Sequence, residues 1–390
     1  MNINDEYFTI LLLAIATFSI FLSTNLIKPV LPVLAESLGG EDLEIASIMM
    51  ISIILLSLIQ PFGGALADRY GYNKMIVIGG LIGAFSSLLC IFANNWNQLL
   101  ILRGLGGLAD AISGPAILAI VASISERRRG FVFGIFRSSQ GLSFMIGPII
   151  GAIIAKIFSL RTPFIFDFTL TILAILMFVL FFKGKINVNG EKFNFNGLKS
   201  VVHNVDLLKI AYLGFSEGFS FTIWISFLPV YMLSLFMSEI EIGLILSIEA
   251  LAFSISNIIV GYLSDRVDQK ILALIGAFMT SIISILYLFS YDLSSLIVLS
   301  IFYGFGCSII FLLSTIMASY IIPSNLRATL LGAFDSIMDL GLAIGPIICW
   351  IILKVSGLSI KYAFLVMAIS TFIAIPIISS VKLSKNNGEG

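Results

Sequence analysis

The chain has 390 residues, of which 59% are hydrophobic and 11% are charged, and its formal net charge is zero. Soluble domains carry roughly 25% charged residues, so this composition excludes a string of soluble domains, and the balanced charge gives no reason to expect a nucleic-acid partner. The chain is therefore expected to fold in a lipid bilayer.

Apolar stretches long enough to cross a bilayer recur from one end of the sequence to the other. Because an unpaired backbone group in hydrocarbon costs several kcal/mol, these stretches are predicted to be helices. The predicted fold is an all-α polytopic membrane protein with twelve transmembrane helices. The spans are expected at residues 8–28, 45–66, 75–93, 98–122, 131–156, 163–182, 207–234, 241–263, 271–290, 294–320, 328–354 and 361–381.

Most Lys and Arg residues fall in alternate connections between these spans, which the positive-inside rule places in the cytoplasm together with both termini. A polar, Asn- and Lys-rich stretch is predicted to be a cytoplasmic linker at 183–206. It separates a six-helix bundle at 1–182 from a second bundle at 207–390, which ends in a short cytoplasmic tail. We expect a multi-pass protein of a prokaryotic cell membrane, and a monomer.

The two predicted halves repeat each other in sequence. The segment from Gly64 to Arg69 is echoed 197 positions later, with Asp68 matched by Asp265. Four residues recur at a shift of 198: Arg129, Gly134, Gly147 and Pro148 return as Arg327, Gly332, Gly345 and Pro346. A parallel six-plus-six repeat is typical of secondary transporters that bind substrate between the halves and alternate access by rigid-body rocking.

Two motifs of the first half resemble the major facilitator superfamily, and the resemblance covers essentially the whole chain. The pattern Gly64-x3-Asp68-Arg69-x-Gly71-x2-Lys74 is similar to that family's loop between helices 2 and 3, with Tyr72 and Asn73 where basic residues are usual. The pattern Arg103-x3-Gly107 is similar to its intramembrane arginine motif, with Gly106 in place of the common glutamine and Asp110 in place of a small residue.

Three shorter motifs resemble the twelve-helix drug/proton antiporters of that superfamily. They are Leu22-Ser23-x5-Pro29-Val30-x-Pro32, Gly147-Pro148-x2-Gly151 and Gly341-x3-Gly345-Pro346. Departures are Ser23 for glycine, Ser143 and Ala152 for the outer glycines, and Ile347 for leucine. The resemblance implies export, while the spacing alone is equally compatible with ordinary close packing of helices.

Charged residues at the predicted cytoplasmic ends form a candidate gate. A carboxylate after helix 2 or helix 8 can accept bonds from the N-terminus of another helix, and the resemblance implies a breakable latch. Solvated loop charges are the alternative. The candidate gate residues are Gly64, Asp68, Arg69, Gly71, Lys74, Arg129, Asp265, Arg266 and Arg327.

Ionisable residues inside the spans are candidates for proton coupling, since each charge near the bilayer centre costs roughly 2.5–3.5 kcal/mol and should face a cavity or a partner. Asp335 and Asp339 lie one turn apart and repel when both are ionised, so at least one is expected to hold a proton. Arg137 and Asp335 are expected to approach across the pseudo-two-fold axis, with a purely structural ion pair as the alternative. The full set is Arg103, Asp110, Arg137, Glu217, Glu249, Asp335 and Asp339; Asp167 is expected to be solvated near the outer face.

The function favoured is proton-coupled antiport that exports amphipathic or lipophilic small molecules. Candidates for an apolar substrate wall are Phe136, Gln140, Phe144, Phe221 and Trp224. The partners expected are a small-molecule substrate, protons and the lipid bilayer, with no cofactor and no metal. The chain has no Gly-x4-Gly-Lys-Ser/Thr loop, so a primary ATP-driven pump is not expected. Its single histidine, His203, falls in the linker, so an enzyme is not expected either. A transporter of a specific polar metabolite, and a membrane receptor without transport, are the alternatives.

Overall fold

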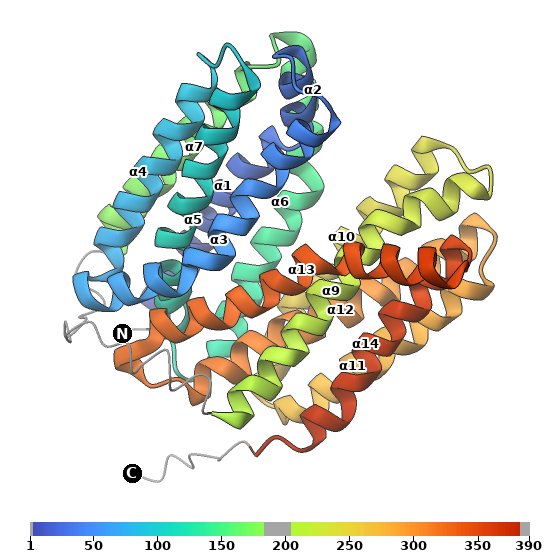
Figure 1. The fold of residues 1–390 in the computed structure, drawn as a ribbon. Helices are drawn as coiled ribbons and strands as arrows, with labels where there is room; N and C mark the ends of the chain where they lie inside the picture. The colour runs from blue at the N-terminus through green and yellow to red at the C-terminus, as the bar shows by residue number, and fades with distance from the viewer. Residues whose placement is uncertain (1–2, 183–203, 383–390) are drawn as a thin grey trace.

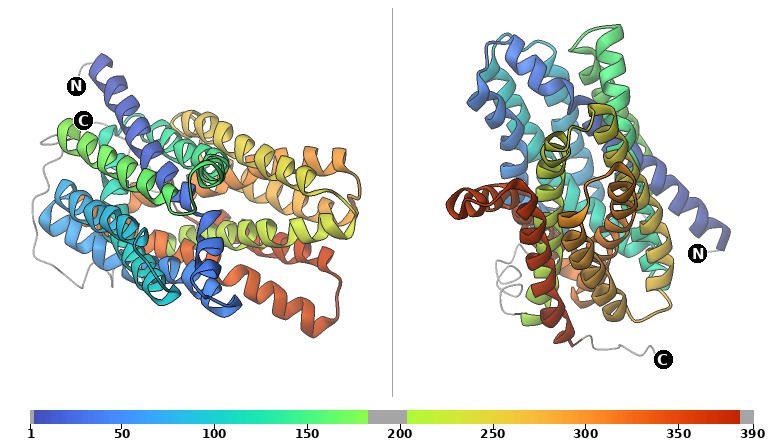
Figure 2. Two further views of the ribbon diagram at one scale, coloured as in Figure 1. Left: turned by 90° about the horizontal axis from the view of Figure 1, so that it is seen from above. Right: turned by 90° about the vertical axis from the view of Figure 1, so that its right-hand side faces the viewer.

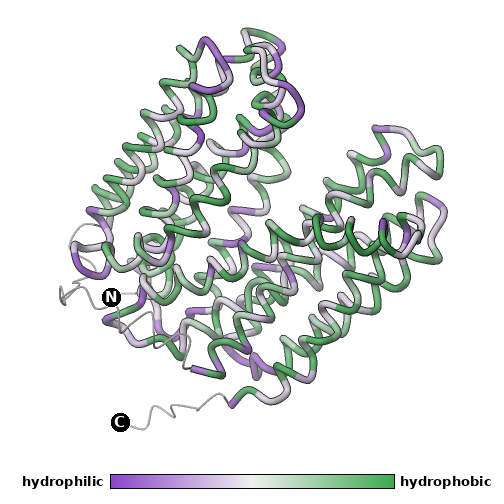
Figure 3. The backbone as a smooth tube through the Cα atoms, viewed as in Figure 1, coloured by the Kyte–Doolittle hydropathy of each residue, from purple (hydrophilic) through white to green (hydrophobic). Residues whose placement is uncertain are grey.

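The computed structural model describes residues 3–182 and 204–382, and twelve helical segments in these ranges are long and apolar enough to cross a membrane. The predicted all-α fold with twelve spans is confirmed. Apolar residues cover the helices along their length, as Figure 3 shows. The first half holds α1 (Ile3–Ile27), α2 (Val30–Ser37), α3 (Asp42–Tyr70), α4 (Tyr72–Cys90), α5 (Trp96–Ile124), α6 (Arg129–Ile157) and α7 (Thr162–Phe182). The second holds α9 (Val205–Ser234), α10 (Glu239–Ser264), α11 (Gln269–Leu286), α12 (Leu293–Ile321), α13 (Arg327–Ser356) and α14 (Ala363–Ser379), with short 3₁₀ turns at Tyr287–Phe289, Ser324–Leu326 and Ile360–Tyr362.

The first span is longer than the sequence predicts, because α1 and α2 together make one membrane-length segment that reaches Ser37. Proline has no N–H to continue the helical ladder, and the chain breaks its helix at Pro29 before resuming at Val30. The apolar pattern marks the start of this span, while its end lies past the proline at which the prediction stops.

The two halves pack together at one end and diverge at the other (Figure 1). Contacts between the halves come mainly from α3 with α13 and from α6 with α10. The start of α1 and the end of α14 lie at the closed end (Figures 1 and 2). The predicted linker at 183–206 lies almost wholly outside the described residues, and α9 begins within its last two residues, at Val205. With the termini in the cytoplasm, as the charge pattern predicts, this is an outward-facing arrangement.

Glycines of the two antiporter-like motifs pack helices within each half. A Cβ on Gly147 would lie 2.6 Å from the Cβ of Asn25, and one on Gly151 would lie 1.9 Å from the carbonyl oxygen of Leu26, both on α1. In the second half, Gly341 and Gly345 approach the α9 backbone in the same way, at Phe215 and Phe219. Pro148 and Pro346 lie inside continuous helices. The repeat therefore places α6 on α1 and α13 on α9 at distances that only glycine permits.

Candidate functional site

The closed end is held by a carboxylate from α3 at the N-terminus of α13. Asp68 accepts hydrogen bonds from the backbone N–H groups of Ala328 at 3.0 Å and Thr329 at 2.8 Å, and from the Thr329 hydroxyl at 2.6 Å. The hydroxyl of Tyr72, which lies in the same half as Asp68, donates a fourth hydrogen bond to Asp68 at 3.1 Å. The first N–H groups of a helix have no partner within that helix, so an anion there is favourable. This contact joins the two halves.

The second half supplies the equivalent contact to the first. Asp265 accepts hydrogen bonds from the backbone N–H groups of Gly130 at 2.7 Å and Phe131 at 2.9 Å, at the start of α6. Burial raises the pKa of Asp265, and the two backbone N–H groups act against this rise. The two contacts are related by the sequence repeat, as is the close packing of Gly64 on Ala328 and of Gly261 on Gly130.

Two arginines at the starts of α6 and α13 reach across the halves in the same symmetric way. Arg129 donates to the carbonyl oxygen of Ser319 at 3.0 Å, and Arg327 donates to the Ser123 hydroxyl at 2.7 Å. Each arginine therefore ties the start of one helix to the C-terminal end of a helix in the other half.

The other basic residues of the candidate gate do not take part in these contacts. Arg69, Lys74 and Arg266 are exposed. Arg69 lies over the ring of its neighbour Tyr70 in α3, and Arg266, just past the end of α10, lies over the ring of Tyr262 in that helix. Gly71 has φ +99°, which allows the chain to turn between α3 and α4 without a side-chain clash.

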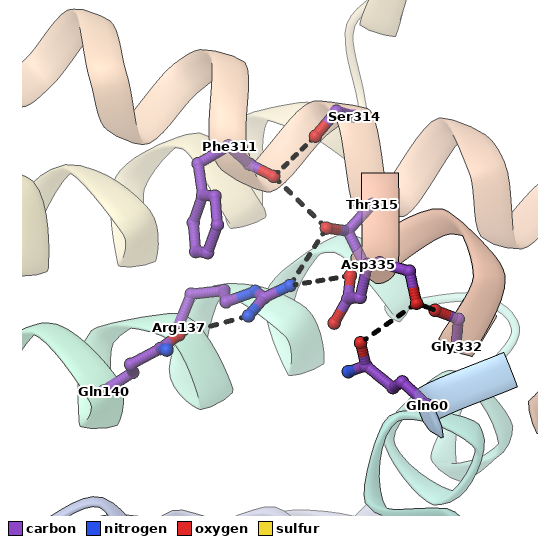
Figure 4. A network of polar contacts seen from close by, with 9 residues as sticks. Gln60, Arg137, Gln140, Phe311, Ser314, Thr315, Gly332 and Asp335 are labelled. Carbon is purple, nitrogen blue, oxygen red and sulfur yellow. Dashed lines mark hydrogen bonds and ion pairs between the residues drawn. The ribbon is translucent and has the colours of Figure 1, made fainter. Parts of the chain in front are cut away.

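Deeper between the halves, the Arg137 side chain of α6 contacts α12 and α13 of the second half and one residue of its own helix (Figure 4). Its guanidinium lies 3.6 Å from the Oδ1 atom of Asp335 on α13. It donates to the Thr315 hydroxyl on α12 and to the Gln140 side chain, both at 3.1 Å. The ring of Phe311 lies 4.1 Å from the guanidinium carbon. The expected approach of Arg137 and Asp335 across the halves is thus observed.

This ion pair is buried and loosely bonded. The Arg137 and Asp335 side chains are 5% and 13% exposed, yet 3.6 Å exceeds hydrogen-bond distance. Asp335 Oδ1 has no hydrogen-bond partner among the described residues. Next to the pair, Ser336 donates to the Gly332 carbonyl at 2.9 Å and to Gln60 of the first half at 3.5 Å.

Three acids share the field of the one guanidinium. Arg137 interacts electrostatically with Asp335, with Asp339 one turn along α13, and with Glu217 on α9. Glu217 in turn interacts with Glu249 on α10. Both glutamates are 4% exposed. With one positive charge among these acids, full ionisation would leave an excess of negative charge in a low-dielectric region.

Two of the five predicted wall residues are packing residues in this arrangement. Trp224 is 1% exposed, stacks on Tyr303 at 5.3 Å and donates its indole N–H to Tyr287 at 3.1 Å. Phe136 is 3% exposed and packs edge-on against Phe21. The wall prediction is therefore wrong for these two, because an aromatic side chain on an apolar helix faces the bundle interior as readily as a cavity.

The other three wall candidates keep accessible surface. Phe144 is 41% exposed and lies under the ammonium group of Lys28, 4.1 Å from the ring centroid. Phe221 and Gln140 are partly exposed.

A separate polar cavity lies inside the first half, among α1, α4, α5 and α7. Arg103 and Asp110 both line it, as the sequence suggests. Asp167 lines it as well, although the sequence predicts a solvated position. Asp167 is 7% exposed and accepts hydrogen bonds from Ser87 at 2.5 Å and Thr171 at 3.3 Å. Its separation by several apolar residues from the nearest polar loop is the sequence signal for burial.

The sequence profile of the Major Facilitator Superfamily matches residues 13–238 and again residues 210–387. The chain belongs to the major facilitator superfamily. Members of this superfamily are membrane transporters and not enzymes.

Among superfamily members, the "Uncharacterized MFS-type transporter MJ1560" of Methanocaldococcus jannaschii is 26% identical over 364 residues, which cover 90% of this chain and 92% of the relative. The "Quinolone resistance protein NorA" of Staphylococcus aureus is 34% identical over 165 residues, and this match spans 41% of each chain.

Solved major facilitator structures share the fold over nearly the whole chain. The human organic anion transporter MFSD10 superposes with a TM-score of 0.80 at 16% identity and covers 96% of this chain and 99% of its own. The transporter FucP in the outward conformation superposes with a TM-score of 0.81 at 14% identity and covers 97% of this chain and 100% of its own.

Proposed function

We propose that this major facilitator protein is a proton-coupled antiporter that exports amphipathic or lipophilic small molecules by rocking its two halves about a central site. The observation that carries the proposal is the buried pair of Arg137 and Asp335, which joins the halves at 3.6 Å. An ion pair between two moving bodies has different partners in the two states, so its protonation is linked to the conformational change.

The charge balance around Arg137 supports coupling to a proton. Asp335, Asp339 and Glu217 share one guanidinium. A proton on one of these acids relieves the excess negative charge, and a cationic substrate does the same. Substrate and proton therefore compete to neutralise the same excess negative charge. Such competition is what exchange of the two requires.

The apolar surroundings support a lipophilic substrate. The exposed ring of Phe144 and the partly exposed rings of Phe221 and Phe311 lie on α6, α9 and α12. Export is supported by the antiporter-like glycine motifs of α6 and α13 and by the partial likeness to a quinolone resistance protein. A latch that closes the predicted cytoplasmic end through Asp68 and Asp265 supports alternating access.

The proposal is tested by proton movement in proteoliposomes that contain the purified protein under an imposed pH gradient. Lipophilic cations and polar metabolites are added in turn to the wild type, to Asp335→Asn and to Asp339→Asn. Asp42→Asn, an exposed change at the far end of α3, is the matched control.

We expect lipophilic cations to release protons across the wild-type and Asp42→Asn membranes, and at least one of the central variants to lose this flux. Saturable flux with one polar metabolite and none with the cations would favour a metabolite transporter instead. Full flux in both central variants would remove these acids from coupling.

A further inference from the structure

Three arginines form a cluster at the closed end, where the two halves meet. Arg128 and Arg129 stand at the start of α6, and Arg327 is the first residue of α13. Arg129 is 6% exposed, whereas Arg128 and Arg327 are partly exposed. The arginine cluster therefore runs from the predicted cytoplasmic surface into the interface between the halves.

Two members of the arginine cluster face each other across the halves. Arg129 and Arg327 are equivalent residues of the sequence repeat, and their guanidinium groups act on each other electrostatically. Like charges repel, and a low-dielectric interface strengthens the repulsion. A negative charge between the two groups would turn this repulsion into an attraction that joins the halves.

No carboxylate neutralises the arginine cluster by direct contact. In the part of the chain that the structure describes, no acid lies within 4 Å of any of the three guanidinium groups. Glu126 and Asp265 act on Arg129 from a greater distance. Asp265 is already bonded to the start of α6, as Asp68 is to the start of α13, and Glu126 is exposed to solvent. The nearby acids therefore have other partners.

Hydrogen-bond donors of the arginine cluster are left over. A guanidinium carries five N–H donors. Arg129 uses one on the Ser319 carbonyl oxygen, and Arg327 uses one on the Ser123 hydroxyl. The buried Nε atoms of both, and the buried Nη1 atom of Arg128, have no hydrogen-bond partner among the described residues. Buried charged donors need acceptors, and these residues do not supply them.

Tyrosine rings hold two of the guanidinium groups in place. The guanidinium carbon of Arg129 lies 4.6 Å from the ring centroid of Tyr320 on α12, and that of Arg128 lies 4.8 Å from the ring centroid of Tyr7 on α1. Stacking occupies the face of a guanidinium and leaves its N–H edge available. The donors are thus oriented before a ligand binds.

The ligand that suits this arrangement is an anion with oxygen atoms on more than one side. Guanidinium groups bind carboxylate and phosphate oxygens in pairs. A carboxylate presents both oxygens in one direction, whereas a tetrahedral phosphate presents oxygens to donors on opposite sides. A phosphate dianion also matches the charge of two opposed guanidinium groups.

We propose that Arg129 and Arg327, with Arg128 beside them, bind one phosphate group between the halves at the predicted cytoplasmic end. The bound group bridges the two repeat-related arginines and holds this end closed. It therefore favours the outward-facing arrangement and must leave before the closed end opens. Free phosphate compounds of the cytoplasm and lipid headgroups with a phosphate monoester share this chemistry. The site depends neither on the transported substrate nor on the coupling ion.

The test uses the purified full chain, with inorganic phosphate as the probe. Equilibrium dialysis with radiolabelled phosphate counts the ions bound per chain. The thermal unfolding midpoint is compared in sodium phosphate and in NaCl at equal pH and ionic strength. Both measurements are made on the wild type, Arg129→Gln, Arg327→Gln and Arg69→Gln. Arg69 is the matched control, because it is an exposed arginine at the same end that also lies over a tyrosine ring.

We expect about one phosphate per wild-type chain. At about five times the dissociation constant, phosphate should raise the midpoint by about 2–4 °C over NaCl. Arg69→Gln should behave as the wild type. Arg129→Gln and Arg327→Gln should each lose about tenfold or more of the affinity, and the rise in midpoint with it.

A second arm distinguishes the two sources of the phosphate group. The same four chains are placed in phosphatidylcholine nanodiscs with and without phosphatidic acid. If a headgroup fills the site, phosphatidic acid raises the midpoint in the wild type and Arg69→Gln but not in Arg129→Gln, and free phosphate adds no further rise. If free phosphate fills the site, phosphatidic acid has no effect and added phosphate raises the midpoint as in detergent.

The proposal is overturned if phosphate raises the midpoint equally in all four chains, because phosphate strengthens burial in any protein by its exclusion from the surface. It is also overturned if the wild type binds no phosphate in dialysis and responds to neither phosphate nor phosphatidic acid. Arg129 bonds to Ser319, so Arg129→Gln can fail to fold. Arg129→Lys then replaces it, since lysine keeps the charge without the paired donors, and wild-type affinity in that variant would equally contradict the proposal.

Discussion

Replacement of Asp68 by asparagine should open the closed end of the protein. The carboxylate accepts three hydrogen bonds from Ala328 and Thr329 of the other half, two of them from the backbone. Asparagine keeps one acceptor oxygen and loses the charge. Hydrogen bonds to charged groups contribute about 1.5–3 kcal/mol each and an anion at a helix N-terminus up to about 2 kcal/mol, so a net loss of about 2–4 kcal/mol is expected. At about 1.4 kcal/mol per factor of ten, the ratio of closed to open forms should fall about 30- to 700-fold.

The assay is the distance between spin labels on the two halves at this end. Glu126, between α5 and α6, and Ser324, between α12 and α13, are exposed and lie in repeat-related connections. The buried cysteines are replaced before labelling. A longer distance should become populated in Asp68→Asn and stay rare in the wild type. Asp42→Asn on the same helix is the matched control and should behave as the wild type.

An unchanged distance distribution in Asp68→Asn would refute this reasoning. It would mean that close packing, such as that of Gly64 on Ala328, holds the halves together without the carboxylate. Equal opening in Asp42→Asn would show instead that any lost charge on α3 has this effect.

Two further predictions concern the same framework. Gly261→Ala would place a Cβ 2.6 Å from a backbone oxygen of α6 and should open the closed end, whereas Gly243→Ala on the same helix meets no atom within 4 Å and should not. Trp224→Ala should lower the free energy of unfolding by about 3–5 kcal/mol in a detergent unfolding experiment and leave the order of preference among substrates unchanged, because the side chain is buried in the second half; a changed substrate order would restore it to the substrate wall.

The fold follows from the sequence because bilayer thickness sets the length of each apolar stretch and the repeat fixes the relation between the halves. The position of Arg137 opposite Asp335 follows from the same repeat, since equivalent residues of the two halves meet near the pseudo-two-fold axis. The expectation that a carboxylate at the end of helix 2 accepts bonds from the N-terminus of another helix similarly predicts the kind of contact that Asp68 makes. Its bonding partners Ala328 and Thr329, however, are known only from the structure.

The sequence does not show which side of each helix faces lipid and which side faces the interior of the bundle. Lipid and the interior of a bundle are both apolar, so hydropathy does not distinguish them. For this reason Trp224 and Phe136 are wrongly placed on the substrate wall, and Asp167 is wrongly placed in solvent. Gln60 is a polar residue in an apolar span beside Pro61, and this pattern is a sequence signal for a contact between the halves. In the structure Gln60 accepts a hydrogen bond from Ser336 of the other half.

The most direct measurement of the central claim is substrate-driven proton flux in the double variant Arg137→Gln with Asp335→Asn, beside its thermal unfolding. Removing one partner of a buried ion pair destabilises by about 3–5 kcal/mol, while replacing both with neutral groups should restore most of the stability. The double variant should keep most of the wild-type stability and, if the pair couples protons to transport, carry no substrate-dependent proton flux. Wild-type flux in this stable double variant would show that the pair is only structural, and would contradict the account.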